Sequence, residues 1–266
     1  MSITALDIRK RILKMANVSG RSAHIGGSLS MVELLTVLYR DVMNYKFDDP
    51  RWEDRDRFIL SKGHCVLALY AILTECGAIS EEEAQTFLQD GSRLGSHPVM
   101  NLDLGIESST GSLGQGISMA VGTAKAAKLK GKNYQVYVLI GNGECNEGSV
   151  WEAVMLAAQW KLDNLTVILD NNGLQSDGKS IDIIELSHIK QKFEAFGFYA
   201  VSVDGHDERE ILNAFHDKIK QKPKVIIGNT IKGKGVSVME HNNEWHHNRL
   251  IKEVYDQALA ELEEKA

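Results

Sequence analysis

YQVYVLIGNGECNEG (134–148) begins as a run of β-branched and aromatic residues and ends in a loop rich in glycine and polar side chains. LTVILDNNGLQSDG (165–178) has the same character, and EGSVWEAVMLAAQWKL (147–162) between them has helical spacing. Two continuous apolar runs joined by a helix are typical of neighbouring parallel strands in a sheet that is buried on both faces. We therefore predict strands at 134–140 and 165–170 whose carboxyl ends lie side by side.

Outward from this unit, the chain continues to alternate between apolar runs and helical spacing. This alternation predicts an α/β fold, a parallel sheet with helices on both faces. No linker or low-complexity run interrupts it, so we expect one domain over residues 1–266. We predict helices at 3–17, 31–43, 65–77, 80–89, 187–197, 208–219 and from about 248, and a glycine-rich turn leading into a helix within 111–131. Further strands are expected at 199–203 and 224–230, a short strand that runs into a glycine turn at 57–64, and a loop at 19–30.

Composition excludes several classes of protein. A net charge of −6 argues against nucleic acid as the main partner, and no apolar run is long enough for a membrane span. The amino-terminal segment has mixed charge and helical spacing, which is not typical of a signal peptide. Cys65, Cys76 and Cys145 match neither a zinc site nor a disulfide framework, so we expect a cytoplasmic protein.

Polar loops follow the two central strands. Asn142 and Asn172 offer amide oxygens, and Gly141 and Gly143 let backbone N–H groups approach an anion closely. Oxygen ligands beside exposed N–H groups suit Mg²⁺ that bridges to a diphosphate. The same residues also suit ordinary turns, and spacing alone leaves these two interpretations about equal.

The spacing resembles the thiamine diphosphate signature, Gly-Asp-Gly followed about thirty residues later by Asn. The resemblance extends over nearly the whole chain to the N-terminal, diphosphate-binding domain of transketolase, and more narrowly to the separate N-terminal subunit of split transketolases. It rests on SAHIGGSLS (22–30), DRFILSKGH (56–64), GSHP (95–98), TGSLGQGIS (110–118), GNGECNEGSVWEA (141–153), LDNNGLQSDG (169–178) and IKGKGVSVMEHNNEWH (231–246).

The resemblance implies a role for particular positions. It places Mg²⁺ on the side chains of Asn142 and Asn172 and on the backbone carbonyl of Leu174. It places thiamine diphosphate against Gly111, Leu113, Gly141, Gly143, Glu144 and Asn172. Catalytic positions are His24, His64, His97 and His246, which would orient hydroxyl groups and move protons, and Glu147, which would face the cofactor-activating glutamate of a partner chain. His241 and His247 are expected to face solvent.

Two positions depart from the family pattern. Asn142 stands where the family has Asp, so we expect weaker binding of metal and cofactor, since an amide brings a dipole rather than a full charge. Ala23 replaces the glycine that usually precedes the first histidine, and it carries little weight.

The resemblance further implies a subunit that is active only with a C-terminal partner chain, as an α2β2 heterotetramer. Together they would move a two-carbon ketol group from a ketose phosphate to an aldose phosphate, as in the pentose phosphate pathway. Three alternatives stay open: a non-catalytic or weakly cofactor-binding paralogue, a subunit of a deoxyxylulose phosphate synthase-like enzyme, and one of a 2-oxoacid dehydrogenase-like enzyme. The absence of a GxxxxGK[ST] loop disfavours a nucleotide enzyme.

Overall fold

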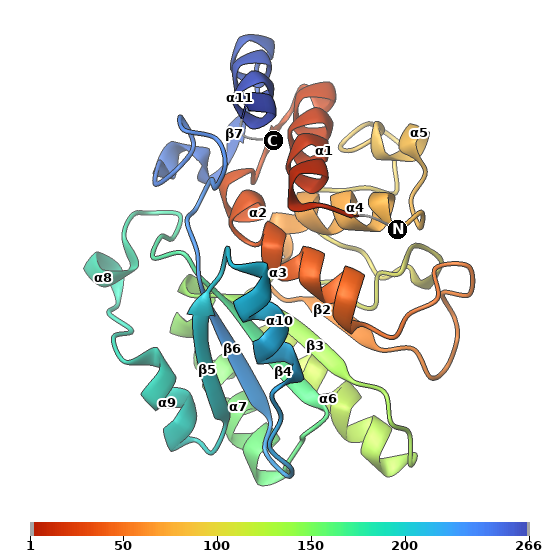
Figure 1. The fold of residues 1–266 in the computed structure, drawn as a ribbon, viewed down its shortest axis with the longest axis vertical. Helices are drawn as coiled ribbons and strands as arrows, with labels where there is room; N and C mark the ends of the chain where they lie inside the picture. The colour runs from red at the N-terminus through yellow and green to blue at the C-terminus, as the bar shows by residue number, and fades with distance from the viewer. Residues whose placement is uncertain (1–2, 265–266) are drawn as a thin grey trace.

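A five-stranded parallel sheet forms the centre of the molecule (Figure 1). The computed structural model describes residues 3–264, so the predicted domain extends two residues beyond the described chain at each end. The strands confirm the predicted positions to within a few residues. In spatial order they are β2 (Arg57–Leu60), β3 (Val136–Gly141), β4 (Leu165–Asn171), β6 (Lys224–Asn229) and β5 (Tyr199–Asp204).

The central βαβ unit is formed as the sequence predicts. β3 and β4 pair in parallel, with Val136 opposite Leu165 and Gly141 opposite Asp170. This register brings the loops after Gly141 and after Asn171 to the same edge of the sheet. The two predicted strand tips therefore meet.

Helices cover both faces of the sheet and divide the core into two clusters. Alternate residues of each strand point to opposite faces, as in any strand. In β3, Val136, Val138 and Ile140 pack beneath one layer, whereas Tyr137 and Leu139 face the other. The first layer contains α6 (Gln115–Leu129), α7 (Gly148–Gln159) and α9 (Ile189–Ala195); the second contains α1 (Ala5–Ser19), α2 (Gly26–Ser30), α3 (Val32–Val37), α4 (Val66–Glu75), α10 (Glu208–His216) and α11 (Lys252–Glu264).

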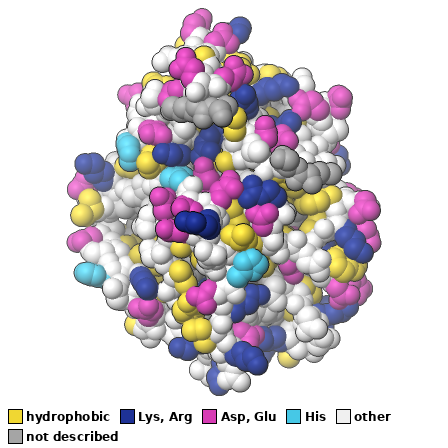
Figure 2. All heavy atoms as spheres, in the orientation of Figure 1, with side chains coloured by type: hydrophobic (Ala, Val, Ile, Leu, Met, Phe, Trp, Pro, Cys, Tyr) yellow, Lys and Arg dark blue, Asp and Glu magenta, His cyan; other side chains and the backbone are white. Residues whose placement is uncertain are grey.

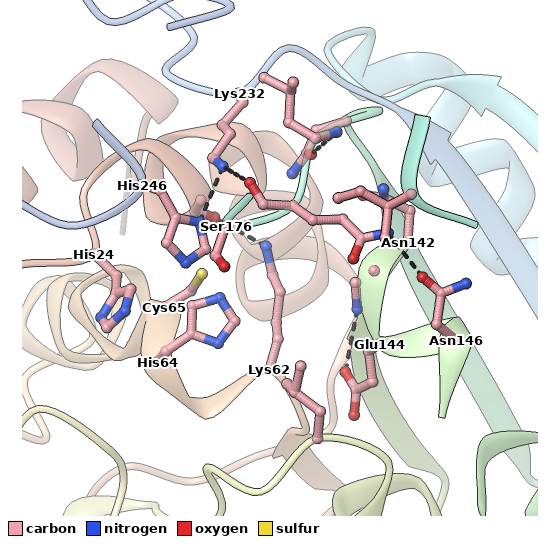
Figure 3. Close-up of a pocket in the computed structure, with 18 of the residues that line it drawn as sticks. His24, Lys62, His64, Cys65, Asn142, Glu144, Asn146, Ser176, Lys232 and His246 are labelled. Atoms are coloured by element: carbon pink, nitrogen blue, oxygen red, sulfur yellow. Dashed lines mark hydrogen bonds between the residues drawn. The ribbon is translucent and has the colours of Figure 1, made fainter. Parts of the chain in front are cut away.

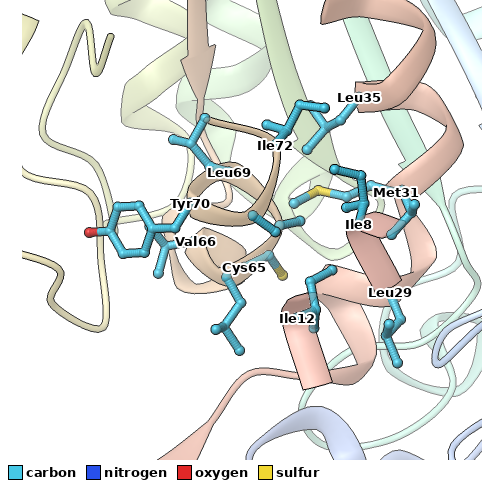
Figure 4. Packing of buried hydrophobic residues seen from close by; sticks show 14 of the residues in the cluster. Ile8, Ile12, Leu29, Met31, Leu35, Cys65, Val66, Leu69, Tyr70 and Ile72 are labelled. Carbon is cyan, nitrogen blue, oxygen red and sulfur yellow. The ribbon is translucent and has the colours of Figure 1, made fainter. Parts of the chain in front are cut away.

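In the second layer, α1, α2 and α3 pack against α4 (Figure 4). Ile8 and Ile12 of α1 and Leu35 of α3 are fully buried in this cluster, together with Leu29 and Ile72. The helix α4 is buried along nearly its whole length, which matches its uninterrupted apolar sequence. This packing fixes the start of α4, where the SKGH sequence lies.

The predicted loop at 19–30 is wrong in part, because it contains a short strand and a helix. β1 (Ser22–Ala23) pairs with β7 (Asn248–Arg249), and α2 occupies Gly26–Ser30. Burial of Leu29 and hydroxyl bonds to backbone carbonyls stabilise α2 despite its glycines: Ser28 donates to the carbonyl of His24 at 2.7 Å. Tertiary contacts override the weak helix propensity of this sequence.

The predicted helix at 80–89 is shorter than expected. α5 spans only Glu81–Ala84, with Ser80 as its N-cap. Leu88 adopts φ of 58°, a left-handed conformation that no helix continues through. A further short helix, α8 (Ser180–Ile183), follows the β4 loop and had no clear signal in the sequence.

The surface carries mixed charge. On the face shown in Figure 2, acidic and basic side chains are interspersed rather than gathered into regions of one sign. Among residues 3–264, no helix is both long enough and apolar enough to cross a membrane.

Candidate functional site

A cavity of about 420 Å³ opens at the carboxyl ends of β3 and β4. It lies where ligands bind in open parallel sheets, outside the ends of the strands. Every site residue predicted from the sequence lines it except His97. The remaining lining residues are Gly27, Lys62, Cys65, Asn146, Gln175, Ser176, Ile183, Ile184 and Lys232.

The side chains of Asn142 and Asn172 lie against each other at the base of this cavity. The terminal amide of Asn142 lies 3.2 Å from Oδ1 of Asn172 and is also hydrogen-bonded to the hydroxyl of Ser180. Asn172 Oδ1 in turn accepts from the backbone N–H of Leu174 at 3.1 Å. When the Asn142 amide is oriented so that its nitrogen donates to Asn172 Oδ1, one direct hydrogen bond joins the two strand tips.

Asp170, at the end of β4, is the centre of a buried polar cluster. Its carboxylate is fully buried and accepts from Lys62 Nζ at 2.5 Å, Ser30 Oγ at 2.6 Å, Asn172 Nδ2 at 2.9 Å, and the hydroxyl of Thr230. Burial alone would raise the pKa of Asp170, but the charge of Lys62 and the other donors outweigh it, and the net pKa is lowered. Asp170 therefore stays ionised and holds four segments together beneath the cavity.

Glu144, in the loop after β3, holds neighbouring loops of the cavity together by hydrogen bonds. Its carboxylate accepts from the backbone N–H of Gly114 at 2.8 Å and of Gly141 at 3.2 Å, and from the hydroxyl of Ser61. Burial raises the pKa of Glu144, and these donors offset part of that shift. Glu144 thus fixes the start of α6 relative to the end of β3.

Histidines gather at the other side of the cavity, near the start of α4 (Figure 3). The ring of His24 lies 4.9 Å from that of His64, 5.2 Å from that of His246 and 6.3 Å from that of His97, between centroids. His247, expected to face solvent, is exposed but also joins the group, with its ring 4.5 Å from His24. Four separate stretches of sequence bring their imidazoles to one place.

Three of these imidazoles, His24, His64 and His246, are held neutral. Burial, followed by the nearby His64, lowers the pKa of His24 to about 3. Burial and the charge of Lys62 lower the pKa of His64 to about 4, and burial and Lys232 lower that of His246 to about 3. A neutral imidazole presents one donor and one acceptor, so the cluster suits binding of hydroxyl groups rather than of anions.

Lys232 joins three loops across the cavity mouth. Its Nζ lies 3.0 Å from the carbonyl oxygen of Gln175, 3.0 Å from Oδ1 of Asn243 and 3.0 Å from Nδ1 of His246. All three partners are neutral acceptors, and burial lowers the pKa of Lys232 to about 8. Nδ1 of His246 accepts this bond, which leaves the proton of the neutral ring on Nε2, away from Lys232.

His97 and Glu147 lie at the edge of the site. A Cβ on Gly111 would come within 2.9 Å of Cδ2 of His97, so the missing side chain at Gly111 makes room for that imidazole. Glu147 is exposed and precedes α7. Among the lining residues that the sequence analysis missed, Lys62 and Lys232 lie within the SKGH and IKGKG motifs, which were the signal for them.

The family described as "Transketolase, thiamine diphosphate binding domain" matches residues 4–262. One of the subunits of the apulose-4-phosphate transketolase of Phocaeicola vulgatus is 42% identical over 97% of this chain and 92% of that protein. A 6-deoxy-6-sulfo-D-fructose transketolase subunit of a Clostridium species is 41% identical over 97% of this chain and 94% of that protein.

Solved structures show the same fold. The transketolase of Campylobacter jejuni superposes with a TM-score of 0.89 at 34% identity, over 99% of this chain. This chain spans 43% of the length of that transketolase.

Proposed function

The chain belongs to the family of transketolase thiamine diphosphate binding domains, and from this premise we propose that it is the diphosphate-binding subunit of a split transketolase. The observation that carries the proposal is the meeting of Asn142 and Asn172 at the base of a cavity whose opposite side is lined by histidines. An anion-binding end and a hydroxyl-binding end then lie in one cavity, as a phosphorylated cofactor and a sugar require.

The chemistry of the cavity fits the diphosphate. Lys232 is a buried ammonium whose partners are all neutral, so its charge is available to an anion. Gly143 lines the cavity, so its backbone can approach a bound anion. A side chain at this position would crowd Gln175, because a Cβ would come within 2.9 Å of Gln175 Cγ. We propose that Gly111, Leu113, Gly141, Gly143, Glu144 and Asn172 form the cofactor-binding wall.

The oxygens of Asn142 and Asn172, with the carbonyl of Leu174, fit a hard cation, and we propose Mg²⁺ at this position. Both side chains are neutral and already hydrogen-bonded within the chain. When bound, thiamine diphosphate would supply the nucleophilic carbon and electron sink for moving a two-carbon ketol unit.

The histidines supply binding and proton transfer. The Nε2–H of His246, fixed by Lys232 on the other ring nitrogen, is a donor to a sugar hydroxyl. His24 and His64, neutral beside it, accept or donate in the same way. We propose these three and His97 as catalytic residues, and the exposed Glu147 as a contact to the partner chain.

We further propose a C-terminal transketolase partner, two copies of each chain, and sugar phosphates as substrates. The names of the relatives support a partner, since both are subunits. One domain over residues 1–266, a cytoplasmic location and a role in the pentose phosphate pathway stay predictions.

The test is to isolate the complex through a tag on this chain and assay transfer between sugar phosphates with thiamine diphosphate and Mg²⁺. Apulose 4-phosphate and 6-deoxy-6-sulfo-D-fructose, which appear in the relatives' names, are included. We expect transfer only when both chains and the cofactor are present. His64→Ala should lower the rate by about 10²-fold or more, whereas the exposed His216→Ala should not change it.

Failure of the complex to bind thiamine diphosphate would reject the proposal. Binding without transfer would support the non-catalytic alternative. Condensation of pyruvate in place of ketol transfer would support the synthase alternative.

A further inference from the structure

The terminal amide of Asn142 lies between two unlike sets of neighbours. On one side are the hydroxyl of Ser180 and, at 3.3 Å, the backbone N–H of Gly143. On the other side are two acceptors, Oδ1 of Asn172 at 3.2 Å and the backbone carbonyl of Asp170 at 3.3 Å. The amide has one oxygen and one nitrogen, so its orientation decides which set is satisfied.

In one orientation every neighbour is satisfied without an ion. The Asn142 nitrogen donates to the oxygens of Asn172 and Asp170, and its oxygen accepts from Ser180 and Gly143. Turned by half a rotation, the amide donates to Ser180 and directs its oxygen at the two acceptors. The side-chain oxygens of Asn142 and Asn172 then face each other at 3.2 Å, an arrangement that a cation between them stabilises.

The hydroxyl of Ser180 keeps a hydrogen bond to the amide in both orientations, whereas the backbone N–H of Gly143 has the amide oxygen as acceptor only in the first. A hydroxyl both donates and accepts, so it bonds to the amide oxygen in the first orientation and to the amide nitrogen in the second. We propose that Asn142 and Ser180 form an amide switch, in which the side chain of Asn142 replaces a divalent cation when none is bound and turns to ligate one when it is. The amide switch lies at the metal position given under the proposed function. It depends on the proposed function only for the assignment of that position.

An aspartate at position 142 would behave differently. A carboxylate has no proton to donate to Asn172 Oδ1 or to the carbonyl of Asp170, so the metal-free site would bring oxygens against one another. The same carboxylate would attract a divalent cation far more strongly than an amide does. Asn142 thus makes the metal-free chain stable at the expense of affinity for the metal.

The test compares thermal unfolding of the full chain in EDTA and in Mg²⁺ with inorganic pyrophosphate, and measures Mn²⁺ binding by electron paramagnetic resonance. For the parent chain we expect nearly equal melting temperatures in the two conditions. Asn142→Asp should lower the melting temperature in EDTA by about 2–4 °C, recover it with Mg²⁺, and bind Mn²⁺ about tenfold more tightly.

Two further variants separate the switch from general effects. Ser180→Ala should lower the melting temperature in both conditions, because it removes a hydrogen bond from both orientations. Asn146→Asp adds the same charge to the same cavity; within residues 3–264, the Nδ2 of Asn146 is buried and has no partner, so no donated bond is lost. It should not reproduce the destabilisation in EDTA or its recovery with Mg²⁺.

Two results would overturn the proposal: an Asn142→Asp chain that is as stable as the parent in EDTA, or a parent that binds Mn²⁺ as tightly as Asn142→Asp does. Neither measurement uses a substrate or thiamine diphosphate. Failure of the switch is therefore distinguishable from failure of the transfer assay.

Discussion

Replacing Lys62 by methionine should destabilise the fold strongly, although the two side chains are similar in size. Nζ of Lys62 donates to the buried carboxylate of Asp170 at 2.5 Å and to the carbonyl of Gly27 at 2.9 Å. The exposed fractions of the Lys62 and Asp170 side chains are 4% and 0%. Methionine would leave an ionised carboxylate in a region that water does not reach.

The expected loss is about 3–5 kcal/mol, the range for removing one partner of a buried ion pair. In a chain of this size it corresponds to a fall in melting temperature on the order of 10 °C. Urea unfolding followed by circular dichroism gives the free energy of unfolding directly. Asp170→Asn should be destabilising in the same way, and the double variant Lys62→Met/Asp170→Asn should cost about 1–3 kcal/mol less than the sum of the two.

Lys190→Met is the matched control, because Lys190 forms an exposed pair with Glu194 at 3.9 Å. It should cost less than about 1 kcal/mol. The reasoning is refuted if Lys62→Met costs no more than this control, or if the costs at Lys62 and Asp170 simply add.

Three further predictions concern pH and backbone geometry. The folded-state pKa of Asp170 lies below its ordinary value of 3.8, so its contribution to stability is present above that pH and is lost as pH falls through the folded pKa; acid titration of the free energy of unfolding should show this loss in the parent and not in Asp170→Asn. His24 and His64 should remain neutral between about pH 5 and 8 in an NMR titration, and a midpoint above pH 6 would contradict the burial argument. Gly233 and Gly77 have φ of 82° and 81°, but a Cβ on Gly233 would lie 2.1 Å from a backbone carbonyl oxygen, whereas Gly77 has nothing within 4 Å. Gly77→Ala should therefore cost about 1–2 kcal/mol, and Gly233→Ala clearly more, by urea unfolding.

The part of the fold with the simplest local pattern could be predicted from the sequence. Apolar runs at 134–140 and 165–170, with one helix between them, were sufficient to place β3 beside β4 and their polar tips together. The position of β6 between β4 and β5 could not be predicted this way, because strand order depends on how the helices pack on the two faces.

The buried polar contacts that hold the site residues in place were harder to predict. Asp170 and Lys62 are 108 positions apart, and no local pattern reveals that two charges so distant form a buried pair. The same holds for Lys232, whose partners come from two other loops. Family resemblance indicated most of the residues that line the cavity, whereas the ion pair of Lys62 and Asp170 is evident only in the folded structure.

The helix α2 shows the limit of composition as a guide. Glycine and serine predict a loop, since neither favours a helix. Here a Cβ on Gly27 would lie 2.6 Å from the Sγ of Cys65, so the small residue is needed for α2 to approach α4. The glycine reflects close packing rather than a turn.

The bonds of Lys232 also set the order in which the site can form. One wall of the cavity comes from residues near 24, another from residues 141–147, and the mouth is joined by Lys232 to residues near 175 and 246. Contacts between such distant positions form late, because the chain entropy of closing long loops opposes them until the sheet is in place. A growing chain that has not yet reached residue 232 thus holds the strand tips without Lys232 or His246, and cannot offer a ligand the finished cavity.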